Sequence, residues 1–245
     1  MKDMGDRENN QKVISLPFGD KTLEVGVPDR IIFNGAMEYI RPADNFEELL
    51  LQRIKHPVGC EPLEEMISPS EKILILIEDN TRNTPVKKIL PVLIDYLKAC
   101  GIGPDDIEIL TAPGTHRIMT ESEIIEKVGE AVASSIKISQ HDFRDSASLV
   151  DFGMVKAGAG EIPIQVNKKA LDADFIIGLG NIVPHCDAGF SAGAKIVQPG
   201  ICGYTTTAAT HVAAALLDEI PLDWLRIPAD GGWKKWQSGS GCALL

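Results

Sequence analysis

The strongest constraint on the fold is a repeated order of apolar run, polar loop and helical segment. Residues 72–77 (KILILI) form a continuous apolar run, which is typical of a strand that is covered on both faces. Similar runs occupy residues 107–110 and 173–180. The first run is followed by a polar loop and then by apolar residues at helical spacing, which stop near Gly101. This alternation predicts an α/β domain with a largely parallel sheet.

The remaining predicted elements are a hairpin and two further helices. Residues 13–27 contain two strand patterns around a Phe-Gly-Asp-Lys turn and predict an N-terminal β-hairpin. A helix is expected to begin after residues 44–45, which include good capping residues. Thr120 and Glu123 have the spacing of a capping box and predict a helix to about Val132. Together these elements predict a Rossmann-like sheet with flanking helices, preceded by the hairpin.

The chain is expected to contain one folded domain between two irregular ends. Residues 1–12 are charged and predict a disordered N-terminus, and residues 13–217 hold all the periodic segments. Residues 218–245 contain all three tryptophans but no clear periodicity, which predicts an irregular tail.

Composition excludes several classes of function. The net charge of −11 argues against broad binding to nucleic acid or to an anionic membrane. No stretch approaches the roughly 20 apolar residues of a membrane-spanning helix, and the N-terminus lacks the apolar core of a signal peptide. The five cysteines are scattered without a CxxC pair, which disfavours disulfide frameworks and thiolate zinc sites. We therefore expect a cytoplasmic protein with free thiols.

Chemically interesting residues cluster in loops that follow the predicted strands. In parallel sheets, ligands bind beyond the carboxyl ends of the strands. Asp79, Thr81 and Arg82 lie between the first strand and its helix, where backbone N–H groups and a guanidinium favour a phosphate or carboxylate. The alternative is a solvated loop with an N-cap. In the next loop, His116 lies beside Arg117 and can exchange protons near neutral pH, although a lone loop histidine is more often an ordinary surface residue.

The third loop, residues 184–200, is rich in small residues and contains His185 and Lys195. Small residues let the backbone approach a ligand closely, and the lysine offers a phosphate contact or a nucleophilic amine. A GxxxxGK(S/T) phosphate-binding loop is excluded, because Lys195 follows an alanine and precedes an isoleucine. His211, taken alone, is an ordinary helix histidine, and it has no histidine partner at the spacing of a zinc site.

Taken together, these segments resemble the N-terminal domain of the nickel-pincer lactate racemase family. The resemblance covers roughly residues 13–215. The matching segments are residues 79–85 (DNTRNTP), residues 114–117 (GTHR), residues 184–201 and His211.

The resemblance implies a cofactor and a role for each residue. The cofactor would be the nickel(II) pyridinium-3,5-bisthiocarboxylate mononucleotide, or nickel-pincer nucleotide, attached covalently through Lys195. His211 would supply the remaining nickel ligand, in a planar site that suits nickel(II). His116 and His185 would act as alternating general bases. Asp79, Thr81 and Arg82 would hold the cofactor, and Arg82 would also hold the substrate carboxylate.

The expected function is racemisation of a small anionic 2-hydroxy acid, with lactate as the default, by reversible hydride transfer to the cofactor. Cofactor biosynthesis enzymes are the expected partners. The sequence departs from the family at Ala192, where glycine is usual, a change that we expect to be tolerated. From the length we expect the chain to lack the family's C-terminal domain, and a separate C-terminal domain is a further candidate partner.

Three other readings remain open at this point. The chain can be a racemase or epimerase of another 2-hydroxy acid or sugar acid. It can be a cofactor-binding fragment without independent activity. It can also be a generic nucleotide-binding α/β domain, which leaves the combination of His185, Lys195 and His211 unexplained.

Overall fold

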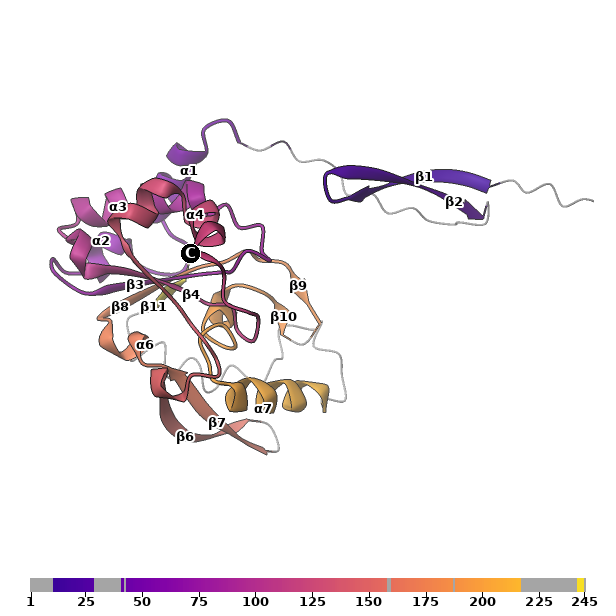
Figure 1. The fold of residues 1–245 in the computed structure, drawn as a ribbon. Coiled ribbons are helices and arrows are strands. Elements are labelled where there is room, and N and C mark those ends of the chain that lie inside the picture. Colours follow the sequence, from indigo (N-terminus) through magenta and orange to yellow (C-terminus); the bar gives the residue numbers. More distant parts are fainter. Residues whose placement is uncertain are drawn as a thin grey trace, which may run out of the picture. The chain divides into compact units, whose positions relative to one another are not determined.

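The computed structural model describes residues 11–28, 41, 43–157, 160–186, 188–216 and 242–244 (Figure 1). Contacts between Cα atoms divide the chain into two compact units, Met1–Asp44 and Asn45–Leu245. Most of the predicted N-terminal segment and of the predicted tail lies outside the described residues.

The first unit contains the predicted hairpin. Strands β1 (Gln11–Phe18) and β2 (Lys21–Pro28) pair antiparallel, from Phe18 opposite Lys21 to Gln11 opposite Pro28. The connection is a two-residue turn in which Gly19 has a φ of 62°. Tight hairpin turns of this kind require positive φ, which glycine adopts without strain. The predicted hairpin is confirmed.

The second unit is built on a parallel sheet. Its strands run in the order β11-β8-β3-β4-β5, and every neighbouring pair is parallel. The strands are β3 (Ile73–Ile77), β4 (Ile107–Thr111), β5 (Lys137–Gln140), β8 (Phe175–Leu179) and β11 (Cys242–Leu244). β3 lies at the centre and is buried along its whole length, as a strand covered on both faces should be. The predicted parallel α/β sheet is confirmed.

Helices connect the strands. They are α1 (Phe46–Lys55), α2 (Leu63–Met66), α3 (Val86–Ala99), α4 (Glu121–Val128), α5 (Glu130–Ser135), α6 (Lys169–Asp172) and α7 (Tyr204–Ala215). Short 3₁₀ turns occupy η1 (Pro104–Asp106), η2 (Ser146–Ser148) and η3 (Gly193–Ile196). The capping box of Thr120 and Glu123 is present at the start of α4. The helix predicted to reach Val132 is interrupted, because Gly129 has a φ of 88°, outside the helical range, and separates α4 from α5.

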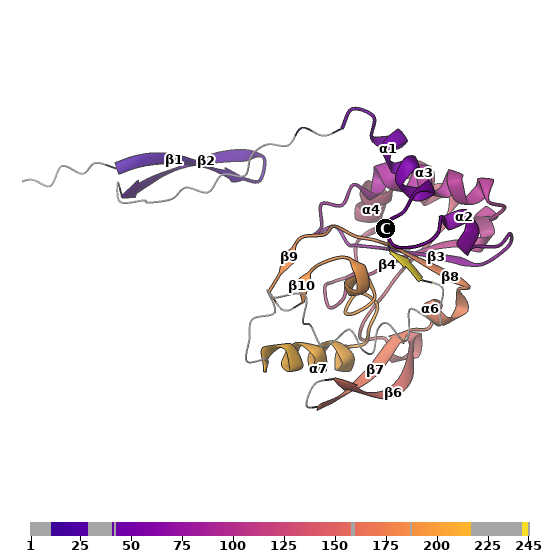
Figure 2. The ribbon, with the colours of Figure 1, turned by 180° about the vertical axis from the view of Figure 1, so that it is seen from behind.

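Two apolar cores cover the two faces of the sheet. Alternate residues of a strand point to opposite faces, so Ile75 belongs to one core and Leu76 to the other. The first core includes Leu90 and Leu97 of α3, and the second includes Ile201 in the loop before α7. Opposite views show α1, α3 and α4 on one side of the sheet, and the hairpin β6–β7 with α7 on the other (Figures 1 and 2).

The second face carries elements that the sequence patterns do not predict. Strands β6 (Leu149–Ala157) and β7 (Gly160–Asn167) form an antiparallel hairpin with an irregularity between Asp151 and Met154. A bridge between Val166 and Cys202 ties this hairpin to the segment before α7. Two short strands, β9 (Pro184–His185) and β10 (Gly189–Phe190), form a second small hairpin. Within the described residues, no helix is long and apolar enough to cross a membrane.

Candidate functional site

One cavity of about 150 Å³ opens where β3, β4 and β8 end. Six of the seven predicted site residues lie in its wall: Asp79, Arg82, His116, His185, Lys195 and His211. The seventh, Thr81, is not part of the wall but contacts Asp79 and Arg82. The fold therefore gathers residues from four separate segments of the chain at one edge of the sheet, as the topology of parallel strands predicts.

Asp79 and His116 form a hydrogen-bonded pair in this wall. Asp79 is only 3% exposed, and its Oδ2 lies 2.7 Å from Nδ1 of His116. The other carboxylate oxygen accepts from the hydroxyl of Thr81 at 2.6 Å and from the Thr81 backbone N–H at 3.2 Å. Because an ionised carboxylate only accepts hydrogen bonds, Nδ1 of His116 is the protonated nitrogen. The lone pair of a neutral His116 ring is therefore on Nε2, where it can take up a proton.

The loop that carries Arg82 is fixed by α4. Lys127 donates from Nζ to the carbonyl oxygen of Arg82 at 2.7 Å. Partial burial lowers the pKa of Lys127, and the nearby carboxylates of Glu78 and Asp79 oppose that shift. The guanidinium of Arg82 donates to the hydroxyl of Thr81 at 3.1 Å. Arg82 thus brings a positive charge to a cavity that also contains two carboxylates.

Glu123 of α4 joins the loops that follow β3 and β4. Arg117 donates to both oxygens of Glu123, at 2.6 and 2.8 Å, and Asn80 donates to one of them at 2.8 Å. The hydrogen bonds from Arg117 lower the pKa of Glu123 to about 2. Arg117, which follows His116 in the sequence, is therefore engaged by Glu123 and is not part of the cavity wall.

His185 and Lys195 face each other across the third loop. Nζ of Lys195, in η3, lies 2.9 Å from Nε2 of His185, in β9. An ammonium group only donates, so Nε2 accepts from it and a neutral His185 carries its proton on Nδ1. Ser191 stabilises the base of this loop by accepting from the backbone N–H of Val183 at 3.0 Å. The amine and the imidazole are thus placed next to each other before any ligand is bound.

Close backbone packing shapes the same loop. A Cβ atom at Gly200 would lie 1.9 Å from the carbonyl oxygen of Ile196, so only glycine fits there without a backbone shift. Ala192 has φ 60° and ψ −159°, a region that is essentially restricted to glycine. The Cβ of Ala192 therefore imposes a conformational cost that glycine would avoid, and the expectation that alanine is tolerated at this position stays a prediction.

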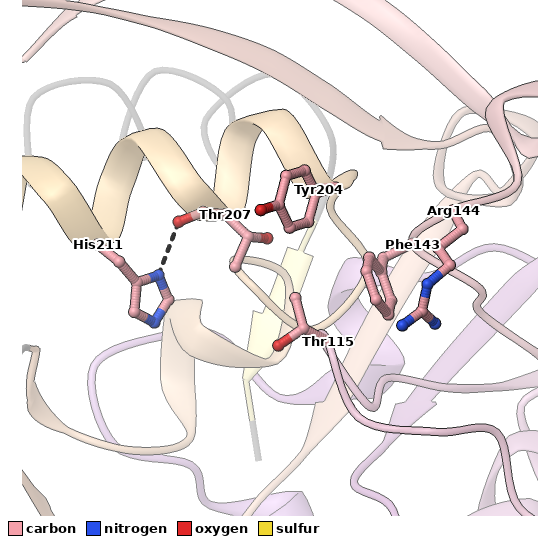
Figure 3. Close-up of a pocket in the computed structure, with 6 residues that line it drawn as sticks. All are labelled: Thr115, Phe143, Arg144, Tyr204, Thr207 and His211. Atoms are coloured by element: carbon pink, nitrogen blue, oxygen red, sulfur yellow. Dashed lines mark hydrogen bonds between the residues drawn. The ribbon is translucent and has the colours of Figure 1, made fainter.

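His211 lies in α7 with one ring nitrogen engaged. Its Nδ1 lies 2.7 Å from the carbonyl oxygen of Thr207, one helical turn earlier (Figure 3). A carbonyl only accepts, so Nδ1 carries the proton and Nε2 has the free lone pair that a metal ligand needs. In the part of the chain that the structure describes, no group of three or more His, Cys, Asp or Glu side chains could hold a metal ion. A metal at His211 would therefore need donors from a ligand.

Sequence reasoning missed one polar residue in the wall. Glu78 is 7% exposed, and its Oε2 accepts from the backbone N–H of Asn181 at 3.2 Å and from the hydroxyl of Thr84. The sequence does contain a signal for this residue, because Glu78 directly follows Ile77, the last residue of β3. Successive residues of a strand point to opposite faces, so the side chain of Glu78 lies on the face opposite that of Ile77.

Comparison with known proteins identifies the family of this chain. Residues 18–220 match the family described as the lactate racemase N-terminal domain. The chain is 34% identical over 205 residues to a lactate racemase of Lactiplantibacillus plantarum, and 30% identical over 202 residues to one of Thermoanaerobacterium thermosaccharolyticum. Each match covers 81% of this chain and 46% of the relative. The chain thus spans less than half the length of these relatives.

Solved structures show the same fold. The lactate racemase apoprotein from Thermoanaerobacterium thermosaccharolyticum aligns with a TM-score of 0.66 at 28% identity, over 82% of this chain and 46% of that one. A protein from Thermotoga maritima aligns with a TM-score of 0.59 at 30% identity, over 69% of this chain and 41% of that one. By the family match and the two curated relatives, this chain belongs to the lactate racemase family, whose N-terminal domain it contains.

Proposed function

We propose that this chain is a racemase that interconverts the enantiomers of a 2-hydroxy acid, with lactate as the default substrate. The proposal rests on the cavity of about 150 Å³. Its wall combines the imidazoles of three histidines, a guanidinium and an amine, from His116, His185, His211, Arg82 and Lys195. The lactate racemases among its relatives supply the reaction class.

The residues of the cavity fit a nickel-pincer nucleotide. His211 offers one imidazole lone pair, and no other described side chains form a metal cluster, so the remaining nickel donors would come from the nucleotide. Lys195 offers the amine for covalent attachment. Pockets that enclose a drug-sized ligand usually measure about 300 Å³ or more. The cavity of about 150 Å³ is smaller, so it would enclose only the reactive end of the nucleotide. When bound, this group would supply a reversible acceptor for hydride.

The two histidines suit proton exchange on the two faces of a substrate. His116 presents Nε2, because Asp79 holds the proton on Nδ1. His185 has its Nε2 against Nζ of Lys195 at 2.9 Å, so this nitrogen becomes available when the lysine takes another partner. We propose that one ring, neutral at the start, would take the hydroxyl proton on one face of the substrate, and that the other ring, protonated at the start, would give its own proton to the product oxygen on the opposite face. Proton exchange with solvent would then restore the two starting protonation states.

Arg82 is the proposed partner of the substrate carboxylate. It supplies a bidentate donor at the cavity wall, which favours a planar carboxylate. The protein as a whole carries a net charge of −11, so an anionic substrate needs such a local positive group. Asp79 and Thr81 would position this arginine and the cofactor.

A second candidate function follows from the length of the match. The chain covers 46% of the curated relatives, so their remaining half has no counterpart in the matched region. If that half supplies substrate contacts, this chain alone would bind the cofactor without turnover. Addition of a separately produced C-terminal domain would then restore racemisation.

The experiment that tests the proposal is intact-mass spectrometry with metal analysis, on protein produced together with the cofactor biosynthesis enzymes. We expect a covalent adduct that maps to Lys195 and about one nickel ion per chain. Lys195→Ala should abolish the adduct, and His211→Ala should lower the nickel content while the organic adduct remains. Lys88→Ala and His56→Ala, at exposed positions outside the cavity, are the matched controls.

Chiral analysis of lactate after incubation then separates the two candidate functions. Racemisation by the chain that carries the cofactor and nickel, without any added domain, supports a self-sufficient enzyme. Racemisation only after addition of the C-terminal domain supports a chain that binds the cofactor without turnover of its own. An unmodified, nickel-free chain, or equal nickel in the His211→Ala variant and the parent, would contradict the assigned site.

A further inference from the structure

The side chains of His185 and Lys195 bring together two groups with complementary proton chemistry. Nζ of Lys195 lies 2.9 Å from Nε2 of His185, and both residues line the cavity of about 150 Å³. An amine is a nucleophile only in its neutral form, and an ordinary lysine, with a pKa of about 10.4, is almost entirely protonated at neutral pH. A nucleophilic lysine therefore needs a neighbouring base that accepts its proton.

The backbone positions both partners of this contact. In the small hairpin of β9 and β10, His185 lies opposite Gly189. The backbone N–H of Lys195 donates to the carbonyl oxygen of Ala192 at 3.0 Å, and the carbonyl oxygen of Lys195 accepts from the N–H of Gly200 at 3.3 Å. The amine and the imidazole thus start from fixed backbone positions, which reduces the entropy cost of proton transfer between them.

An imidazole and a carboxylate act differently on a lysine. Nζ of Lys137 and Nζ of Lys169 lie 3.0 Å and 2.5 Å from the carboxylate of Glu108. That negative charge stabilises the ammonium form, which cannot attack a carbon atom. An imidazole is mostly neutral above about pH 6.5, and its lone pair can take a proton from the amine as a new bond forms. Lys169 is therefore a comparison within the same chain.

We propose that His185 is the general base for covalent attachment of the cofactor to Lys195. The inference rests on the proposed function, because it concerns how the same cofactor is attached. The neutral amine of Lys195 forms a bond to the carbon of a thiocarboxylic acid arm, and the bond from this carbon to its oxygen breaks. Nε2 of His185 takes the proton from Nζ and gives it to the departing oxygen, which leaves as water. The product is a thioamide that keeps the sulfur for nickel, and nothing is oxidised or reduced.

The same step changes the surroundings of His185. Before attachment, Nε2 accepts a hydrogen bond from an ammonium group. After attachment, the nitrogen of Lys195 carries no positive charge, so its hydrogen bond to Nε2 is weaker and a substrate hydroxyl can compete for that nitrogen. One imidazole thus serves first in attachment and then in racemisation.

Thioacylation of the chain without its cofactor tests the inference. The probe is methyl dithioacetate, a small reagent that converts an amine into a thioamide and releases methanethiol. Peptide mapping then gives the rate at each lysine in one sample. At pH 7.5 we expect Lys195 to react about 100-fold faster than the exposed Lys88, since a positioned general base contributes about that factor. Lys169 should react no faster than Lys88.

The pH profile identifies the base. Below about pH 6.5 both the imidazole and the amine must lose a proton, so the logarithm of the rate at Lys195 should rise by about two per pH unit, against about one at Lys88. In His185→Gln the slope at Lys195 should fall to about one. This variant keeps the other charged and titratable groups of the wall, which are Glu78, Asp79, Arg82, His116 and His211.

Substitutions separate a base from a structural residue. His185→Gln keeps a hydrogen-bond acceptor but takes up no proton, so the rate at Lys195 should fall about 100-fold. Unchanged rates at Lys88 and Lys169 in the same sample show that the domain is folded. His185→Ala should be equally slow and should regain rate when free imidazole is added. His56→Ala, at an exposed position, is the control.

A rate at Lys195 equal to that at Lys88, or a rate that His185→Gln does not lower, overturns the inference. Attachment of the cofactor to His185→Gln as rapidly as to the parent also overturns it. Failure of the proposed function is a different outcome. Lys195 would then show thioacylation that depends on His185, but the parent would acquire neither the adduct nor nickel when produced together with the cofactor biosynthesis enzymes.

Discussion

The carboxylate of Asp79 lies 2.7 Å from Nδ1 of His116, although the two residues are 37 positions apart in the sequence. Their strands, β3 and β4, are parallel neighbours, so both loops begin at the same edge of the sheet. Asp79 is buried and receives two further hydrogen bonds from Thr81, which hold the carboxylate in place. The pair thus sets the tautomer and the orientation of the proposed base.

We expect Asp79→Asn to disturb the tautomer of His116 without unfolding the domain. An amide can present either a donor or an acceptor to Nδ1, so the exclusive preference for a proton on that nitrogen is lost. Nitrogen-15 spectra of the imidazole should show Nδ1–H in the parent and a mixture of tautomers in the variant. In an active enzyme that carries its cofactor, the same change should slow racemisation by about 100-fold or more, which is the usual contribution of a positioned acid–base group.

Asp95→Asn, at an exposed position of α3, is the control for this experiment. An unchanged His116 tautomer in Asp79→Asn would mean that the ring is oriented by its other surroundings.

Much of the fold and of the candidate site could be predicted from the sequence for a physical reason. Strands buried on both faces must be continuously apolar, so β3, β4 and β8 are visible as uninterrupted runs. Parallel strands then bring their following loops together, which predicted that residues around Asp79, His116 and His185 converge. β5 has no such run, because its four residues are partly exposed, and β6–β7 is an antiparallel hairpin with an irregular register.

Pairings within the site could not be predicted in the same way. The spacing of Thr120 and Glu123 predicts a helix cap, but the additional hydrogen bonds that Glu123 accepts from Asn80 and Arg117 depend on how two loops pack. The contact between Arg144 and Phe143 likewise arises from local geometry in a loop without periodicity. Such contacts require the three-dimensional arrangement and leave no regular pattern in the chain.

Ala192→Gly should stabilise the protein. Alanine at φ 60° and ψ −159° occupies a region that costs about 1–3 kcal/mol for a residue with a Cβ atom. Glycine removes this cost but increases the conformational entropy of the unfolded chain, by about 0.5–1 kcal/mol. We expect a net gain of about 1 kcal/mol in the free energy of unfolding, measured by urea denaturation.

Ala194→Gly, in the adjacent 3₁₀ turn, is the matched control. Ala194 is not among the described residues with positive φ, so glycine there should lower the free energy of unfolding. If the two variants destabilise the protein equally, the strain at Ala192 has no energetic consequence.

Glu123 should make stability sensitive to acid. Its pKa is lowered from 4.5 to about 2 by Arg117 and by the capping bonds of Thr120, so the folded state favours the ionised form. This contribution is present above pH 4.5 and is lost as the pH falls towards 2. The Tm of the parent should therefore fall between pH 5 and pH 3 by more than that of Glu123→Gln. Glu126→Gln, at an exposed position on the same helix, should retain the pH dependence of the parent.

His141 should give a second pH dependence, close to neutrality. The ring is fully buried, and desolvation lowers its pKa below the ordinary value of 6.5. Its Nε2 lies 3.0 Å from the carbonyl oxygen of Cys202 and therefore carries the proton, while Nδ1 accepts from the Asn167 amide at 3.1 Å. Protonation would place a hydrogen on Nδ1 against that amide, so the folded state requires the neutral ring.

The sign of the effect follows from this lowered pKa. Below pH 6.5 the unfolded chain takes up a proton that folded His141 resists, so stability falls with decreasing pH until the lowered pKa is reached. Asp142 and Asp145, whose charges act in the opposite sense, reduce the size of the effect. Thermal melts from pH 7.5 to 5 should show a decreasing Tm in the parent and a flatter profile in His141→Gln. His56→Gln, at an exposed position, should behave like the parent. Identical profiles for His141→Gln and the parent would show that this buried ring does not control folding in that range.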